Sequence, residues 1–87
     1  MYQVHKGVRG VVTDSGNNLP VSNATIQVEG IEKNVTSYLL GDYWRILTPG
    51  KYVLIVSHNG YVSQRKEIVV TDGAATVANF DLVEKGN

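Results

Sequence analysis

The sequence contains no cysteine, so no disulfide bond contributes to its stability. It also has no excess of charge, because eight Lys and Arg residues balance eight Asp and Glu residues. This balance argues against the basic surface of a nucleic-acid-binding protein or of a polybasic membrane anchor. No apolar run approaches the roughly 18 residues of a transmembrane helix, and no signal peptide is recognisable at the start. The sequence therefore predicts no nucleic-acid partner and no direct membrane contact.

Residues for catalysis or metal binding are equally scarce. Histidine occurs only at His5 and His58, whereas a hydrolytic zinc site needs several ligands and a general base held in a cleft. Ser57, His58 and Asp72 can be grouped as a triad, but no nucleophile-elbow motif surrounds the serine. The sequence predicts no catalytic residues, no metal site and no cofactor within this chain.

What the chain does contain is typical of a small all-β domain. Eighty-seven residues suffice for one domain with one modest core. Short β-branched and aromatic segments recur about every 8–12 residues, with turn residues between them and no helical periodicity. We expect a seven-stranded β-sandwich over residues 7–84, preceded by an N-terminal arm over residues 1–6 and followed by a tail over residues 85–87. We expect the domain to be a monomer in isolation.

The richest hydrophobic region lies between Gly41 and Tyr61. Asp42–Thr48 and Lys51–Ser57 are predicted strands, and Pro49-Gly50 between them is a strong turn signal. The pattern predicts a β-hairpin around which the other strands pack.

Within this region, Tyr52, Val53, Leu54, Ile55 and Val56 form an uninterrupted apolar run. Such a run predicts a central strand that is covered on both faces. High β-propensity without charge or proline is also the signature of an aggregation-prone segment. We therefore expect that the isolated domain can associate into β-rich aggregates through edge strands or an exposed sheet face.

Aromatic residues are the main candidates for the core. Tyr43, Trp44, Tyr52 and Tyr61 all lie in or beside predicted strands. Trp44 has the largest area to bury, so we expect it to fill the core.

The first predicted strand and the loop after it add smaller core candidates. Val8 and Val12 are expected to face inward on either side of Gly10, which marks either a close backbone approach or a bulge. Leu19 and Val21 are expected to fold the following polar loop onto the core.

Two kinds of surface site are suggested. Tyr38, Leu39 and Leu40 precede a turn and form a candidate patch for docking a partner domain, with packing into the domain's own core as the alternative. Asn23-Ala24-Thr25 and Asn34-Val35-Thr36 match the N-glycosylation motif, so Asn23 and Asn34 are candidate glycan sites. Asn23 ends a loop and is the better candidate.

Four segments of the chain together resemble a known family. They are GVRGVVTD, NATIQVEGI, GDYWRILTPGKY and NGY, at Gly7–Asp14, Asn23–Ile31, Gly41–Tyr52 and Asn59–Tyr61. In this order and spacing they resemble the transthyretin-like (prealbumin-like) domain that follows the catalytic domain in metallocarboxypeptidases of the N/E subfamily. Members carry polar or charged residues just before GDYW, where this chain has Tyr38-Leu39-Leu40.

The resemblance implies a transthyretin-like sandwich with a non-catalytic role. The parent protein of such a domain is a zinc enzyme that removes C-terminal Arg or Lys from peptides in the secretory pathway, in some members anchored to a membrane. The domain would support the folding and stability of the adjacent catalytic domain, which holds the zinc. A related hydrolase of hydroxyisourate carries a C-terminal Tyr-Arg-Gly-Ser signature, whereas this chain ends in DLVEKGN. The alternative is an independent β-sandwich module that binds carbohydrate or a cell-surface protein.

Overall fold

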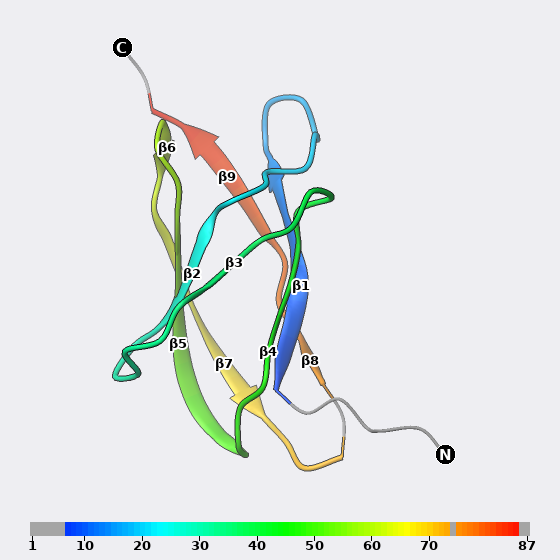
Figure 1. Ribbon diagram of the computed structural model, residues 1–87, viewed down its shortest axis with the longest axis vertical. Helices are drawn as coiled ribbons and strands as arrows, with labels where there is room; N and C mark the ends of the chain where they lie inside the picture. The colour runs from blue at the N-terminus through cyan, green and yellow to red at the C-terminus, as the bar shows by residue number, and fades with distance from the viewer. Residues whose placement is uncertain (1–6, 74, 86–87) are drawn as a thin grey trace.

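The computed structural model describes residues 7–73 and 75–85, and all regular structure in them is β-strand (Figure 1). The predicted N-terminal arm, which includes His5, and most of the predicted tail lie outside these residues. The strands in chain order are β1 (Val8–Asp14), β2 (Thr25–Val28), β3 (Val35–Thr36), β4 (Asp42–Arg45), β5 (Gly50–Ser57), β6 (Tyr61–Val62), β7 (Gln64–Val70), β8 (Thr76–Val77) and β9 (Phe80–Glu84). Over the residues described, no helix is long and apolar enough to cross a membrane.

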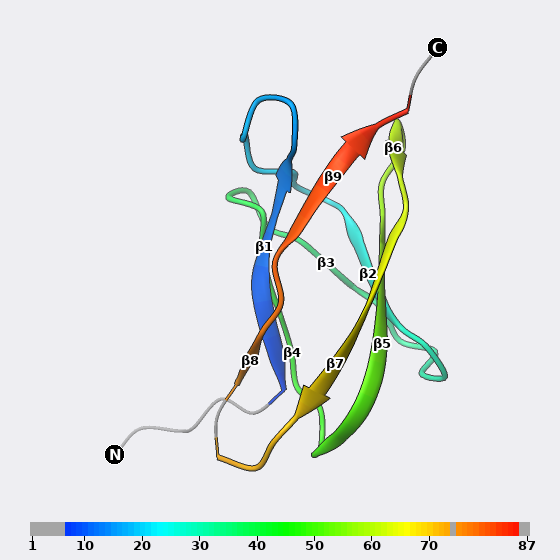
Figure 2. The same ribbon diagram turned by 180° about the vertical axis from the view of Figure 1, so that it is seen from behind.

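The strands form two sheets that pack face to face (Figures 1 and 2). The first sheet has the order β4-β1-β9-β6, with β8 also paired to β1, and the second has the order β3-β2-β5-β7. β1 runs parallel to β8 and β9, whereas its pairing with β4 is antiparallel. The predicted all-β sandwich is confirmed. The described residues form nine strands where seven were predicted, and three of the nine have only two residues.

The predicted hairpin around Pro49-Gly50 is wrong. β4 pairs with β1 in the first sheet, whereas β5 pairs with β2 and β7 in the second. The turn therefore carries the chain from one sheet to the other, as the descending β4 and ascending β5 in Figure 1 show. Asp72-Gly73, a dipeptide common in hairpin turns, lies between β7 of the second sheet and β8 of the first. Turn residues mark a reversal of the chain, but they do not determine which strand becomes the hydrogen-bonding neighbour.

β5 is a central strand, as predicted, because it is paired on both edges. Only one of its faces is fully covered. Leu54 and Val56 are completely buried between the sheets, whereas Val53 and Ile55 are only half-buried on the outer face. The expectation of two covered faces is wrong because the domain has two layers, so each sheet keeps one face toward solvent.

The core lies between the two sheets and is mostly aliphatic. Its fully buried large side chains are Phe80, Ile26, Leu54, Leu82, Val8, Val12, Val28, Val56 and Val70. Val8 and Val12 face inward as predicted, and Val21 folds the loop after β1 onto the core. Leu19 does not, because it is 59% exposed.

Trp44 is not a core residue, contrary to prediction. It is 40% exposed, whereas its neighbour Tyr43 is only 2% exposed. Tyr43 packs against Phe80 with ring centroids 6.3 Å apart, and its hydroxyl donates a hydrogen bond to the carbonyl of Ala78. Successive strand residues face opposite sides of a sheet, so burial of Tyr43 places Trp44 outside. Tyr52 and Tyr61 are partly buried against the core.

Gly10 makes the close approach that its position in a strand predicts. A Cβ atom added there would lie 1.9 Å from the carbonyl oxygen of Ala78. Ala78 and Asn79 separate β8 from β9, and the Asn79 side chain accepts a 2.9 Å hydrogen bond from the Val11 amide. The missing side chain at Gly10 therefore allows β1 to pair with both strands across this break.

Candidate functional site

The turn before β4 has a fixed backbone. The Gly41 amide donates to the Tyr38 carbonyl at 2.9 Å, and the Tyr38 amide donates to the Asp42 carbonyl at 2.8 Å. A third bond, from the Val12 amide to the Gly41 carbonyl at 2.8 Å, ties the turn to β1. Gly41 has a φ of 79°, and a Cβ atom there would lie 2.4 Å from the Val12 carbonyl oxygen. Glycine is therefore required, and the turn is held rigidly against the sandwich.

This rigid turn presents three apolar side chains to solvent. Tyr38 is 66% exposed, Leu39 is 86% exposed and Leu40 is 75% exposed. Packing of the two leucines into the domain's own core, the alternative left open by the sequence, is therefore excluded. The central positions of such turns usually hold proline, glycine or small polar residues. The two exposed leucines therefore bury little apolar area within this domain.

The outer face of the first sheet continues this apolar surface. A hollow of about 490 Å³ includes Tyr38, Arg9, Val11, Trp44 and Val77 in its lining. In the strand register Arg9 lies opposite both Trp44 and Val77, one on each neighbouring strand. Val11 is 38% exposed and Val77 is 58% exposed. We call the Tyr38–Leu40 turn together with Val11, Trp44 and Val77 the apolar face.

The sequence did not group Val11 or Val77 with the candidate docking patch. They come from strands almost seventy residues apart, and only the parallel pairing of β1 with β8 brings them to one face. For Trp44, in contrast, the sequence did contain a signal. Side chains alternate along GDYWR, so an inward Tyr43 places Trp44 on the outer face.

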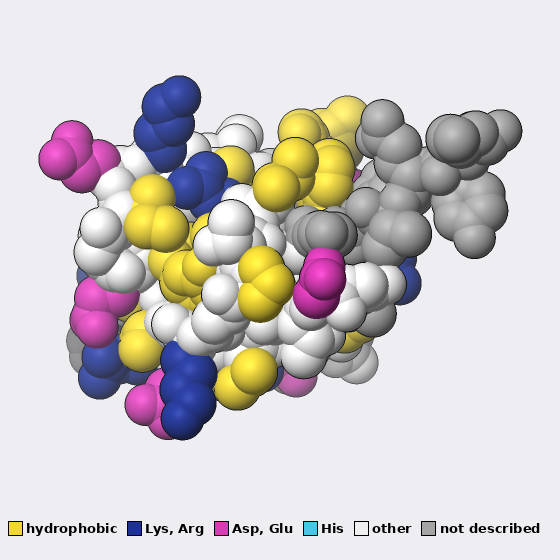
Figure 3. Space-filling view, turned by 90° about the horizontal axis from the view of Figure 1, so that it is seen from below, with side chains coloured by type: hydrophobic (Ala, Val, Ile, Leu, Met, Phe, Trp, Pro, Cys, Tyr) yellow, Lys and Arg dark blue, Asp and Glu magenta, His cyan; other side chains and the backbone are white. Residues whose placement is uncertain are grey.

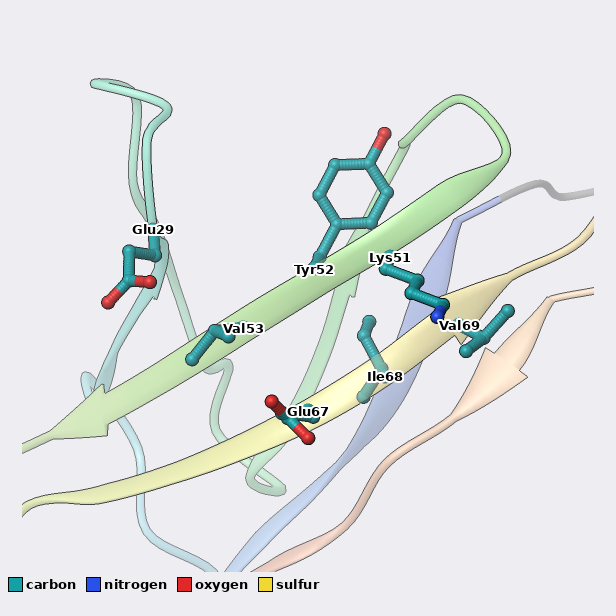
Figure 4. A pocket seen from close by; sticks show the side chains of 7 residues that line it. All are labelled: Glu29, Lys51, Tyr52, Val53, Glu67, Ile68 and Val69. Carbon is teal, nitrogen blue, oxygen red and sulfur yellow. The ribbon is translucent and has the colours of Figure 1, made fainter.

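The outer face of the second sheet carries a different hollow, of about 560 Å³ (Figure 4). Glu29, Lys51 and Glu67 line it together with Val53 and Val69. An ion pair of 3.2 Å joins Glu29 to Arg65 across the exposed surface. Exposed ion pairs of this kind contribute little energy, and charges of both signs alternate here. This face is therefore typical of a solvated sheet surface.

The end of the sandwich at the β4–β5 and β7–β8 connections shows no dominant patch of one type. In Figure 3, which views the molecule from this end, hydrophobic side chains form several groups with basic and acidic side chains between and around them. The visible side of the molecule thus offers no single-sign charged surface.

A buried carboxylate lies at the end of β1. Asp14 is 4% exposed and accepts hydrogen bonds from the Tyr61 hydroxyl at 2.6 Å and from the Gly16 amide at 2.7 Å. These hydrogen bonds hold the pKa of Asp14 below its usual value, and the bond from Tyr61 has the largest effect. The same contact raises the pKa of Tyr61 to about 12. Its partners tie a loop and two strands together, so the arrangement is structural.

The Ser57, His58 and Asp72 grouping is not assembled. Ser57 is the last residue of β5 and His58 follows it, at the end of the strand where Val56 pairs with Gln64. Asp72 comes after Val70, at the opposite end of β7. Over the described ranges, no three His, Cys, Asp or Glu side chains lie close enough to hold a metal ion.

The two candidate glycan sites are both exposed. Asn23 precedes β2, has a left-handed backbone with φ of 61°, and lines a polar hollow with Thr25 and Ser57. Asn34 directly precedes the edge strand β3 and lines none of the four hollows described for this domain.

The sequence and fold were compared with known proteins. The profile of the carboxypeptidase regulatory-like domain matches residues 7–83. Human carboxypeptidase D, of the type that the GDYWR and PGKY motifs most resemble, is 46% identical over 83 residues. Carboxypeptidase Z is 43% identical in human over 80 residues and 40% identical in Gallus gallus over 83 residues.

These alignments cover most of this chain and a small part of each relative. They include 95% of this chain but only 6% of human carboxypeptidase D, and 92% of this chain but 12% of human carboxypeptidase Z. Among solved structures, the 5-hydroxyisourate hydrolase of Klebsiella pneumoniae superposes with a TM-score of 0.69 over 99% of this chain and 91% of that one. Sequence identity there is 14%, so the likeness concerns the fold, and it supports the predicted transthyretin-like architecture.

Proposed function

The chain belongs to the carboxypeptidase regulatory-like domain family, and we propose that it helps the adjacent catalytic domain of a zinc metallocarboxypeptidase to fold and remain folded. The family is that of the regulatory-like part of carboxypeptidases, so the chain is an accessory domain and not the enzyme. The zinc ion belongs to the catalytic domain. The chain spans only 6% of the length of human carboxypeptidase D. The activity of a longer parent protein is therefore proposed as well.

The observation that carries the proposal is the rigid turn with Leu39 and Leu40 exposed at its corner. Three backbone hydrogen bonds hold this turn, so it is organised before any partner arrives. A preorganised contact loses little conformational entropy on docking. Burial of each leucine would contribute about 1.5–3 kcal/mol. Among residues 7–73 and 75–85, nothing covers these two leucines, so their burial can stabilise contact with a neighbouring domain.

The apolar face extends the contact beyond the turn. Tyr38 connects the leucines to Val11 and Val77 on the first sheet, giving one continuous surface. Arg9 lies within it and can pair with a carboxylate of the partner, which would fix the orientation of docking. We therefore propose that the outer face of the first sheet forms the interface. The outer face of the second sheet, which carries charges of both signs, then remains exposed to solvent.

The activity and location of the parent enzyme are also part of what we propose. The enzyme removes C-terminal Arg or Lys from peptides in the secretory pathway, at the Golgi, the cell surface or outside the cell. Its specificity resides in the catalytic domain. Likeness to carboxypeptidases D and Z over nearly the whole chain supports this assignment.

The test uses the full-length enzyme. We expect a Leu39→Ser/Leu40→Ser variant to be secreted at lower yield and to lose activity at a lower temperature than the wild type. Val69→Ser is the matched control, because Val69 is 54% exposed on the second sheet. Hydrogen exchange of residues 38–40 should be slower in the full-length enzyme than in the isolated domain. Equal exchange, with equal yield of both variants, would show that the turn does not dock.

A further inference from the structure

A polar hollow of about 430 Å³ lies at the end of the sandwich where β2 begins and β5 ends. Its lining is formed by Asn23, Thr25, Ser57, His58, Asn59, Tyr61, Ser63 and Lys85. The volume is within the ~300–1,000 Å³ typical of small-ligand sites. No other hollow described in this domain is lined so completely by hydroxyl, amide and ring side chains.

The chemistry of this lining fits a sugar. Ser57, Asn59 and Ser63 can donate and accept hydrogen bonds, and Lys85 adds a cationic donor. The rings of His58 and Tyr61 meet edge to face, with centroids 5.4 Å apart. Two aromatic rings thus stand among the polar side chains that line the hollow, and a pyranose, with polar edges and less polar faces, suits such a mixed lining.

Asn23 is placed so that a sugar in this hollow could be attached covalently to its side chain. Its backbone is anchored, because its amide donates a 3.0 Å hydrogen bond to the Ser37 carbonyl. Its side chain is exposed and lines the hollow, and Thr25, the third residue of the glycosylation motif, lines it too. Asn23 is thus part of the lining itself, so a sugar attached to its side chain starts beside the hollow.

We propose that Asn23 carries an N-linked glycan whose first sugar occupies this hollow and covers the His58–Ser63 turn. The proposal rests on the secretory location proposed above. The glycan shields the rim around Tyr61, and through Tyr61 it stabilises the hydrogen bond to Asp14. A glycan on Asn34 has no such hollow and projects into solvent.

The test compares chains with sugar at a single site. The 87-residue chain is secreted from eukaryotic cells behind a cleavable signal sequence, as Thr36→Ala to leave only the Asn23 motif and as Thr25→Ala to leave only the Asn34 motif. An endoglycosidase then trims each glycan to one N-acetylglucosamine. Intact mass reports occupancy, and hydrogen exchange is compared with the same variants made without sugar in bacteria.

We expect one sugar on Asn23 to slow exchange across residues 58–63 by roughly two- to tenfold, the effect of about one net hydrogen bond. One sugar on Asn34 should leave this segment unchanged. The proposal is overturned if Asn23 carries no sugar while Asn34 does, or if the Asn23 sugar leaves the exchange of residues 58–63 unaltered. Neither result involves a catalytic domain, so both are distinguishable from failure of the docking proposal.

Discussion

The Tyr61 hydroxyl donates a 2.6 Å hydrogen bond to Oδ2 of Asp14, joining residues 47 positions apart in the chain. In the first sheet β9 lies between their strands, so the bond crosses from one side of β9 to the other. Asp14 also accepts from the Gly16 amide, and its own carbonyl accepts from the Asn18 amide at 2.8 Å. One carboxylate thus connects β1, β6 and the loop after β1.

This pair predicts a loss of stability at both extremes of pH. The folded-state pKa of Asp14 is lowered, so its contribution is present above the ordinary value of 3.8 and is lost as pH falls through the folded pKa. The pKa of Tyr61 is raised to about 12, so its contribution is present below 10 and is lost as pH rises toward 12. Tyr61→Phe should flatten both slopes when urea midpoints are measured across pH. An unchanged pH dependence in this variant would contradict the assignment.

Alanine substitutions at two glycines distinguish the destabilising effect of steric crowding from that of backbone strain. Gly10→Ala should destabilise the domain by more than about 2 kcal/mol, because the new methyl group would meet the Ala78 carbonyl oxygen at 1.9 Å and overpack the sheet. Gly30→Ala should cost roughly 1–2 kcal/mol, since Gly30 has open space but a φ of 88°. Urea denaturation gives both values. A Gly10→Ala protein as stable as Gly30→Ala would mean that β1 does not pack closely on the β8–β9 break.

The Tyr43 hydroxyl provides a further test of the core. Tyr43→Phe removes the donor to the Ala78 carbonyl and leaves a buried acceptor without it, at a cost of about 1–3 kcal/mol. Tyr38→Phe is the matched control, because Tyr38 is 66% exposed. The difference in free energy of unfolding between the two variants measures the buried bond. Equal stability of the variants would show that the bond contributes nothing.

Much of the fold could be predicted because strand alternation and turn residues are local signals. The inward positions of Val8 and Val12 in β1 and the central place of β5 followed from periodicity and composition, and a close approach at Gly10 was one of the two expectations for that position. The partner of each strand could not be predicted in this way. A turn such as Pro49-Gly50 has the same composition whether it joins neighbours in one sheet or crosses between sheets.

The candidate site was predicted less completely for the same reason. Tyr38, Leu39 and Leu40 are adjacent in sequence, so their shared exposure could be anticipated. Val11 and Val77 join them only through pairing across the sheet. The contact between Asp14 and Tyr61 likewise depends on the position of β9, so no local pattern indicates it.

β7 is an edge strand of the second sheet, and polar contacts join it to residues of the first sheet and of the β8–β9 connection. The Lys66 ammonium on β7 donates to the Asn79 carbonyl at 2.6 Å and lies 4.8 Å from the centre of the Phe80 ring. The Thr76 hydroxyl donates to the Val69 carbonyl at 2.7 Å. We call these contacts the β7 seam. Strands with open edges can pair with other chains, and the seam limits access to the edge of β7.

The seam makes a specific prediction about self-association. Within the predicted aggregation-prone run at Tyr52–Val56, residues 54–56 of β5 are paired with both β2 and β7, so another chain can pair with this part only after β7 or β2 separates. Lys66→Ala removes the main contact of the seam, at a cost of about 0.5–1 kcal/mol for a partly exposed cation on an aromatic ring. We expect this variant to show a shorter lag in thioflavin fluorescence at neutral pH with agitation. Lys51→Ala is the matched control, because it makes the same charge change on the exposed outer face of β5. Equal lag times for the two variants would show that loss of charge, and not opening of the seam, controls association.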